Sequence, residues 1–271
     1  MKTTWAYKIW GIVYPIGMYY VVSSLVYFVL ELILGTAYEN YMLRQLISAA
    51  ATIPFIWTFY RQDKSMEETV YGKRRLVPRR IEEDTEQEKV SFLHATALGV
   101  LSIIAGGTLG IGINNLIAMT PLIETSSGFK EANSAFFAGT LPYELLGSCL
   151  IIPIAEELLY RGIVYKRLRL YVGVGPAITL SAVLFGAMHF NLVQFVYAGI
   201  LGILLAFLLE KTGFWYTAVL AHCAANVAAV MRQETGWLAF SYEPTVAGIG
   251  VTVLMLAVAA LAILCLHLLE K

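Results

Sequence analysis

The segment PIAEELLYRG, residues 153–162, places two adjacent glutamates and an arginine inside a run that is otherwise apolar. Residues 145–155 contain only Ser148 and Cys149 besides apolar side chains, and residues 163–165 are apolar again. Ionisable side chains inside a membrane span are costly and rare, and they usually mark functional positions. The segment therefore indicates a membrane-embedded helix that carries a site.

The composition is that of a membrane protein with several spans. Of 271 residues, 58% are hydrophobic and 14% are charged, and the mean hydropathy is +0.69. A soluble domain is about 45–50% apolar and about 25% charged. The formal net charge is zero and no basic patch with interleaved aromatics occurs, so no nucleic-acid partner is expected. The three cysteines lie in apolar segments without CxxC spacing, which favours small buried side chains over disulfides.

A spanning helix needs about 20 mostly apolar residues. Eight segments meet this need, at roughly 10–34, 42–60, 91–118, 137–165, 174–190, 192–210, 214–231 and 246–268. The expected fold class is all-α, a polytopic transmembrane bundle of about eight helices in the cell membrane. The first apolar run lacks a small-residue cleavage site, so it is expected to be a spanning helix and not a removed signal.

Positive charges orient the bundle, because cytoplasmic loops are rich in lysine and arginine. The long polar segment at residues 61–89 is expected to be a cytoplasmic loop, and the basic residues 166–169 an inner-surface anchor. With a cytoplasmic N-terminus, sixteen of the 19 lysines and arginines lie on or near the inner side. Both termini are therefore expected to be cytoplasmic.

Helical spacing separates the two glutamates of the opening segment. Glu157 and Arg161 stand four residues apart, so they share a helix face and can form an ion pair. Glu156 lies about 100° further round the helix. We expect Arg161 to hold one carboxylate while the other points elsewhere.

Two further pairs have the same four-residue spacing. Phe185 and His189 occur in FGAMH, and His222 and Asn226 occur in HCAAN. Each pair can present two side chains to one point. Five other polar residues near segment ends are expected at interfaces or in hydrogen bonds between helices: Glu31, His94, Asn114, Asn115 and Glu144.

A carboxylate with a histidine can activate a water molecule as a general base. A second histidine and an asparagine can donate hydrogen bonds to a developing oxyanion. A three-ligand zinc site formed by Glu156, His189 and His222 is the competing reading. The HExxH spacing of zinc peptidases is absent, so water activation without a metal or other cofactor is preferred.

EELLYR (156–161), FGAMH (185–189) and HCAAN (222–226) resemble the EExxxR, FxxxH and HxxxN/D motifs of the CAAX protease and bacteriocin-processing family. This family includes the type II CAAX prenyl endopeptidases. The resemblance covers about residues 135–232 and implies an eight-helix intramembrane endopeptidase of the glutamate type. The chain would then comprise N-terminal helices with the cytoplasmic loop (1–134), a catalytic core (135–232), and an outer loop with the last helix (233–271).

The resemblance also implies a role for each motif residue. Glu156 and His189 would activate the water, and His222 and Asn226 would stabilise the oxyanion. The residues that orient this group or contact substrate would be Glu157, Arg161 and Phe185. The expected substrate is a membrane-embedded or lipidated peptide or protein.

Two other function classes stay open at this point. A non-catalytic immunity or scaffold protein could share the fold, because function belongs to the site. A proton-coupled transporter could use the same residues as a relay, although such proteins often show two matching halves, which this sequence lacks. Gly106 and Gly110 form a GxxxG spacing that favours close helix packing within a monomer.

Overall fold

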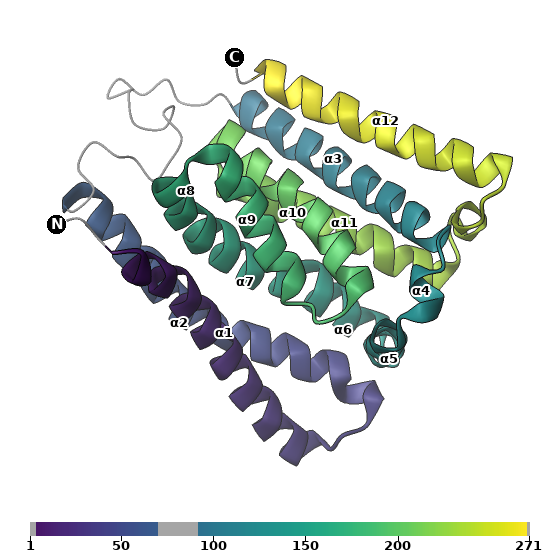
Figure 1. The fold of residues 1–271 in the computed structure, drawn as a ribbon. Coiled ribbons are helices and arrows are strands. Elements are labelled where there is room, and N and C mark those ends of the chain that lie inside the picture. The colour runs from purple at the N-terminus through teal and green to yellow at the C-terminus, as the bar shows by residue number, and fades with distance from the viewer. Residues whose placement is uncertain (1–3, 70–91, 270–271) are drawn as a thin grey trace. The chain divides into compact units, whose positions relative to one another are not determined.

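The computed structural model describes residues 4–69 and 92–269 (Figure 1). These residues form helices joined by short turns, with no strand among them, which confirms the all-α class. The chain divides into two compact units, described here one at a time. The first comprises residues 1–79 and 135–181, and the second residues 80–134 and 182–271.

The first unit begins with two long helices that pack against each other, α1 (Trp5–Leu34) and α2 (Tyr41–Thr69). A short 3-10 turn, Tyr38–Asn40, joins them. The helix α2 runs nine residues past the expected end at residue 60, into the segment predicted to be a loop. The apolar run limits the membrane-spanning part, whereas charged residues such as Lys and Glu continue a helix readily. The rest of the predicted loop, from residue 70 on, lies outside the described residues.

The chain around the paired glutamates is a succession of helical segments. They are α6 (Leu141–Leu146), a π-helical segment (Gly147–Ile151), α7 (Ile152–Leu159), a second π-helical segment (Tyr160–Tyr165) and α8 (Lys166–Val172). The prediction of a helix over 137–165 was therefore wrong at both ends. The first turn of α6 holds Pro142, which suits a helix start. Helix α8 ends at Val172, and Gly173 follows it with a positive φ of 85° that favours glycine.

Helix α2 supports this succession of segments from one side. A Cβ added to Gly147 would lie 2.9 Å from the sulfur of Met42, and one added to Gly162 would lie 3.3 Å from the Tyr60 ring. Arg167 of α8 donates two hydrogen bonds to Asp63 of α2, of 2.8 and 2.7 Å, and a third to the carbonyl of Gly11 in α1. One residue of the basic cluster at 166–169 thus ties three helices together.

Helix α9 (Val174–Ala187) crosses from the first unit to the second between residues 181 and 182. The helix expected over 174–190 is three residues too long. Asn191 is the N-cap of α10 (Leu192–Thr212), and its side chain accepts a 2.9 Å hydrogen bond from the Gln194 amide. The preceding residues leave the helix to reach that cap, and Phe190 takes a left-handed φ of 57°.

The second unit is organised around α3 (Phe92–Ala118), which packs along both α11 (Trp215–Thr235) and α12 (Val246–Leu269) (Figure 1). The short helices α4 (Leu122–Thr125) and α5 (Ser127–Phe136) follow α3 in the chain. A 3-10 turn, Ala239–Tyr242, precedes α12. The helices expected over 91–118, 192–210, 214–231 and 246–268 agree with α3, α10, α11 and α12 within a few residues.

The predicted GxxxG contact is confirmed within this unit. A Cβ at Gly106 would lie 2.1 Å from the carbonyl oxygen of Ala221, and one at Gly110 would lie 3.1 Å from the Cβ of Ala225. A Cβ at Gly112 would lie 2.6 Å from Cδ2 of Leu256 in α12. Only glycine permits the backbones to approach this closely.

The described residues contain four helices long and apolar enough to cross a membrane: α1, α3, α10 and α12. A fifth span is formed if the bent pair Ser127–Phe136 and Leu141–Val172 counts as one. The chain is therefore a multi-pass membrane protein. The 14 residues of α9 cover only about 21 Å, less than the ~30 Å hydrocarbon core. The larger number of eight spans, and the side of each terminus, stay predictions.

Candidate functional site

The predicted site residues belong to both units. Glu156, Glu157 and Arg161 lie in the first unit, whereas Phe185, His189, His222 and Asn226 lie in the second. Each group is described within its own unit.

The two glutamates of α7 have different surroundings. Arg161 Nη1 donates a 2.8 Å hydrogen bond to Glu157 Oε1, and neither side chain has any solvent exposure. Glu156 is half-buried. The expected pairing of Arg161 with Glu157 is confirmed, and the buried charge of Glu157 is compensated. The direction and role of Glu156 stay predictions.

Two π-helical segments enclose α7, from Gly147 to Ile151 and from Tyr160 to Tyr165. A π-helical turn is less regular than an α-helical one, and such turns often occur at functional sites. Arg161 itself lies in the second of these segments. Neither segment could be predicted, because apolar periodicity does not distinguish an α-helical from a π-helical turn over five or six residues.

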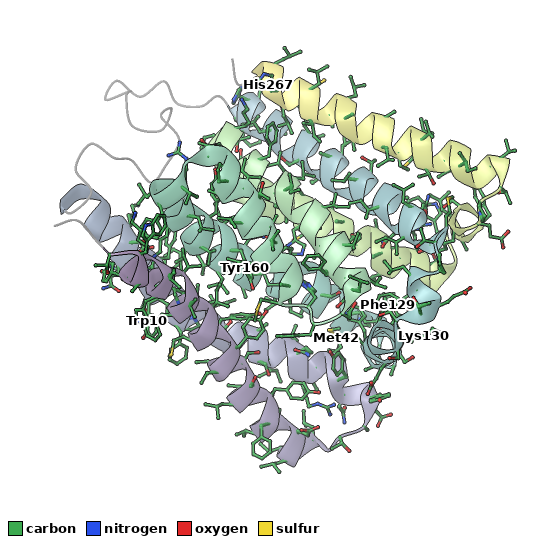
Figure 2. The ribbon with its side chains drawn as sticks, viewed as in Figure 1. Trp10, Met42, Phe129, Lys130, Tyr160 and His267 are labelled. Carbon is green, nitrogen blue, oxygen red and sulfur yellow. The ribbon has the colours of Figure 1, made fainter. Side chains whose placement is uncertain are left out.

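A buried tyrosine stands one helical turn after Glu156 in the first unit. Tyr160, labelled in Figure 2, is 1% exposed and begins the second π-helical segment. Sequence reasoning missed this residue, although its spacing of four residues from Glu156 could have indicated it.

In the second unit, Phe185 joins the two predicted histidines. Its ring, 1% exposed, makes edge contacts with both imidazoles, at centroid distances of 5.2 Å to His189 and 5.6 Å to His222. His189 lies past the end of α9, in the turn that leads to α10, whereas the prediction placed it on the helix. His222 lies on α11 and is 4% exposed. The FxxxH and HxxxN motifs thus meet at one aromatic ring.

A backbone contact sets the tautomer of His189. Its Nδ1 lies 3.0 Å from the carbonyl oxygen of Phe185. A carbonyl oxygen can only accept, so Nδ1 carries the proton and Nε2 of the neutral ring is the acceptor. Nε2 is therefore the atom of His189 that can take a proton from water.

Gly186 allows the end of α9 to pack closely against α10. A Cβ at this position would lie 2.7 Å from the carbonyl oxygen of Phe195, so the end of α9 can approach α10 only because residue 186 is glycine. Gly186 stands between the two aromatic residues of the FGAMH motif. Sequence reasoning did not single it out, and a glycine inside an apolar helix gives only a weak signal. Asn226 is half-buried on α11, one turn after His222.

Among the residues described by the structure, no group of three or more His, Cys, Asp or Glu side chains is arranged to hold a metal ion. Glu156 belongs to one unit and the two histidines to the other, so the zinc alternative with Glu156, His189 and His222 stays a prediction.

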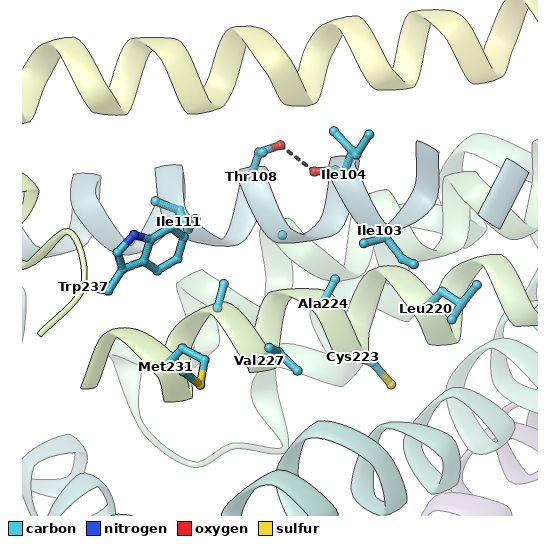
Figure 3. A pocket seen from close by; sticks show the side chains of 12 residues that line it. Ile103, Ile104, Thr108, Ile111, Leu220, Cys223, Ala224, Val227, Met231 and Trp237 are labelled. Atoms are coloured by element: carbon cyan, nitrogen blue, oxygen red, sulfur yellow. Dashed lines mark hydrogen bonds between the residues drawn. The ribbon is translucent and has the colours of Figure 1, made fainter. Parts of the chain in front are cut away.

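A separate hollow lies between α3 and α11 (Figure 3). It has a volume of about 490 Å³ and is open to one side of the unit. None of the predicted site residues lines it. Its walls are formed by Ile103, Ile104, Gly107, Thr108, Ile111, Leu220, Cys223, Ala224, Val227, Ala228, Met231 and Trp237.

The motifs fall inside a segment that is similar to a known family. Residues 138–228 match the type II CAAX prenyl endopeptidase family, Rce1-like. This Rce1-like segment contains every predicted site residue, from Glu156 to Asn226, and it confirms the resemblance to CAAX proteases. It covers about a third of the chain. No curated protein and no solved structure is similar enough to this chain to count as a match.

Proposed function

We propose that the protein is an intramembrane endopeptidase that hydrolyses a peptide bond of a membrane-associated or lipidated substrate. The observation that carries this proposal is the Rce1-like match over the residues that hold all three motifs. Within that segment Glu157 is compensated by Arg161, and the half-buried Glu156 is proposed to carry the chemistry.

In this mechanism Glu156 is the general base. It takes a proton from a water molecule, and the oxygen of that water attacks the carbonyl carbon of the substrate. His189 orients the water through Nε2, because its Nδ1 is held by the Phe185 carbonyl. The proton then passes to the leaving amine as the peptide bond breaks.

His222 and Asn226 are proposed to donate hydrogen bonds to the oxyanion of the tetrahedral intermediate. Such donors act most strongly when they are held in place before the reaction. The Phe185 ring restrains His222 in this way, by an edge contact to a buried imidazole. Glu157 and Arg161 shape the helix that carries Glu156, and they take no part in proton transfer.

The proposed location is the cell membrane, with the reaction served by water from the cytoplasmic side and the protein acting as a monomer. The proposed substrate class follows from the match to the type II CAAX prenyl endopeptidase family. The mechanism requires all four side chains at one peptide bond, so a short distance between Glu156 and His189 during catalysis is itself a prediction.

Cleavage of defined peptides tests the proposal. The purified protein in liposomes would be given lipidated and unlipidated forms of one peptide library, in heavy-oxygen water, and the products would be identified by mass spectrometry. New peptides with one heavy oxygen in the new carboxyl group are expected. If neither form is cleaved, a non-catalytic membrane protein or a transporter with this fold is the better account.

A further inference from the structure

His189, the residue proposed to orient the water, lies in a turn and not in a helix. Helix α9 ends at Ala187 and α10 begins at Leu192. The amide of His189 donates a 3.1 Å hydrogen bond to the carbonyl of Gly186, three residues back, so the four-residue hydrogen-bond pattern of α9 has ended there. The place of this imidazole therefore depends on what holds the turn.

The side chain of Asn191 holds the backbone of His189. Its Nδ2 donates a 3.1 Å hydrogen bond to the carbonyl oxygen of His189. The same nitrogen donates a 2.7 Å bond to Oε1 of Gln194, and Oδ1 accepts a 2.9 Å bond from the Gln194 amide. One side-chain amide thus caps α10 and secures the preceding turn, with both of its polar atoms in use.

The residue between His189 and Asn191 has a backbone conformation that needs such support. Phe190 has a left-handed φ of 57°, which is rare for a bulky side chain and is kept only where the surroundings impose it. Its ring is 78% exposed, so burial in the core does not impose it. Instead, the Asn191 hydrogen bonds fix the start of α10, and Gly186 brings the end of α9 against the carbonyl oxygen of Phe195.

The imidazole of His189 is restrained from a second direction. Its Nδ1 lies 3.0 Å from the carbonyl oxygen of Phe185, which fixes the rotation of the ring, whereas Asn191 fixes the backbone that carries it. A group that acts on a reacting water must stand within about 2.6–3.2 Å of it, and a misplacement of ~1 Å can cost about 100-fold in rate. Loss of the backbone bond is expected to let Nε2 shift on this scale.

We propose that Asn191 is a positioning residue for His189, with Gln194 as its support. Both residues follow the FGAMH motif and belong to none of the three motifs. Asn191 contacts neither the water nor the substrate in this proposal, and it acts through the backbone of His189. The inference rests on the proposed function, because it assigns a partner to the residue that orients the water.

Substitution of Asn191 separates the two tasks of its side chain. Aspartate and serine cap a helix about as well as asparagine, but neither has an N–H group for the His189 carbonyl. We expect Asn191→Asp and Asn191→Ser to lower kcat about 10- to 100-fold, with KM within about twofold of the wild type. The unfolding temperature of Asn191→Ser in detergent should stay within about 2 °C of the wild type.

Asn40 provides a matched control. Its Nδ2 donates a 3.0 Å hydrogen bond to the carbonyl of Leu34, in the connection between α1 and α2. Asn40→Asp removes a bond of the same kind far from FGAMH in the sequence, and it should leave kcat within about twofold of the wild type. A wild-type kcat in Asn191→Asp or Asn191→Ser, or an equal loss in Asn40→Asp, overturns the inference.

A double variant shows whether Asn191 acts through His189. When His189→Ala is already present, Asn191→Ser should change the residual rate by less than about twofold, because the side chain that it positions is gone. A further loss of about 10-fold would overturn the inference. So would a fall in the unfolding temperature of Asn191→Ser as large as that of Asn191→Ala, which would show a packing role only.

The failures of the two proposals are distinguishable when Glu156→Gln is measured beside these variants. An inactive Glu156→Gln with a fully active Asn191→Ser removes the role of Asn191 and leaves the proposed function intact. A fully active Glu156→Gln, or a wild-type protein without cleavage, contradicts the proposed function and this inference with it.

Discussion

Arg161 and Glu157 form an ion pair of 2.8 Å in which neither side chain touches solvent. Two opposite charges at this distance stabilise each other only while both are present. Removing one partner of a buried pair leaves an uncompensated charge, which costs about 3–5 kcal/mol, whereas replacing both by apolar residues is often neutral. The pair is therefore a structural element whose single substitutions should be costly.

Glu157→Gln and Arg161→Met are each expected to lower the free energy of unfolding by about 3–5 kcal/mol. The double variant Glu157→Leu with Arg161→Met should regain most of that loss. Denaturation of the detergent-solubilised protein, followed by circular dichroism, measures all three. Single variants within about 1 kcal/mol of the wild type would contradict the account of a compensated buried pair.

Substitution of the neighbouring Glu156 should abolish cleavage and leave the free energy of unfolding nearly unchanged. Glu156 is half-buried, whereas Glu157 is fully buried in the ion pair with Arg161. Glu156→Gln keeps the volume of the side chain, so its unfolding free energy is expected to change by about 1 kcal/mol or less, while cleavage activity is lost. A loss of stability as large as that of Glu157→Gln would mean that Glu156 also has a structural role.

At Gly106 the backbone of α3 lies close to that of α11. Gly106→Ala places a Cβ 2.1 Å from the Ala221 carbonyl oxygen, so the helices must separate, with an expected cost of about 2–4 kcal/mol. Gly250→Ala in α12 is the control, because no heavy atom lies within 4 Å of a Cβ there. That variant should be neutral or more stable by up to about 1 kcal/mol, since alanine favours a helix. Equal effects of the two substitutions on the unfolding midpoint would refute the contact.

A buried polar network joins α3, α11 and α12 in the second unit. Asn115 of α3 donates a 2.9 Å hydrogen bond to Thr252 of α12 and accepts a 2.7 Å bond from Arg232 of α11. Its side-chain oxygen also accepts a 3.2 Å bond from Ser241. Asn115→Ala removes all three bonds, one of them from a charged group, and should cost about 2–3 kcal/mol. Asn114→Ala, at a half-buried neighbouring position, should cost about 1 kcal/mol or less. Chemical denaturation of the two variants side by side decides this.

Most of the fold could be predicted because apolar runs bound membrane helices. The expected limits of α3, α10, α11 and α12 agree with the structure within a few residues. The predicted helix limits were wrong where a helix continues past its apolar run or ends before it. Charged residues continue α2 and α8 beyond the apolar run, and the Asn191 cap ends α9 before His189.

In the candidate site, only contacts between residues one helical turn apart could be predicted. The Glu157–Arg161 pair and the Phe185–His189 contact follow from a spacing of four residues. The contact between Phe185 and His222 joins residues 37 positions apart. Such contacts depend on tertiary packing, which a single sequence does not reveal.

The most direct test of the central claim is the cleavage rate of the wild type, Glu156→Gln and His189→Ala on one peptide in liposomes, each with and without a chelator. The account predicts that both variants lose at least about 100-fold in kcat while unfolding like the wild type, and that the chelator changes nothing. Cleavage by Glu156→Gln at the wild-type rate would contradict the account, and loss of wild-type cleavage with the chelator, restored by zinc, would replace it with a metal mechanism.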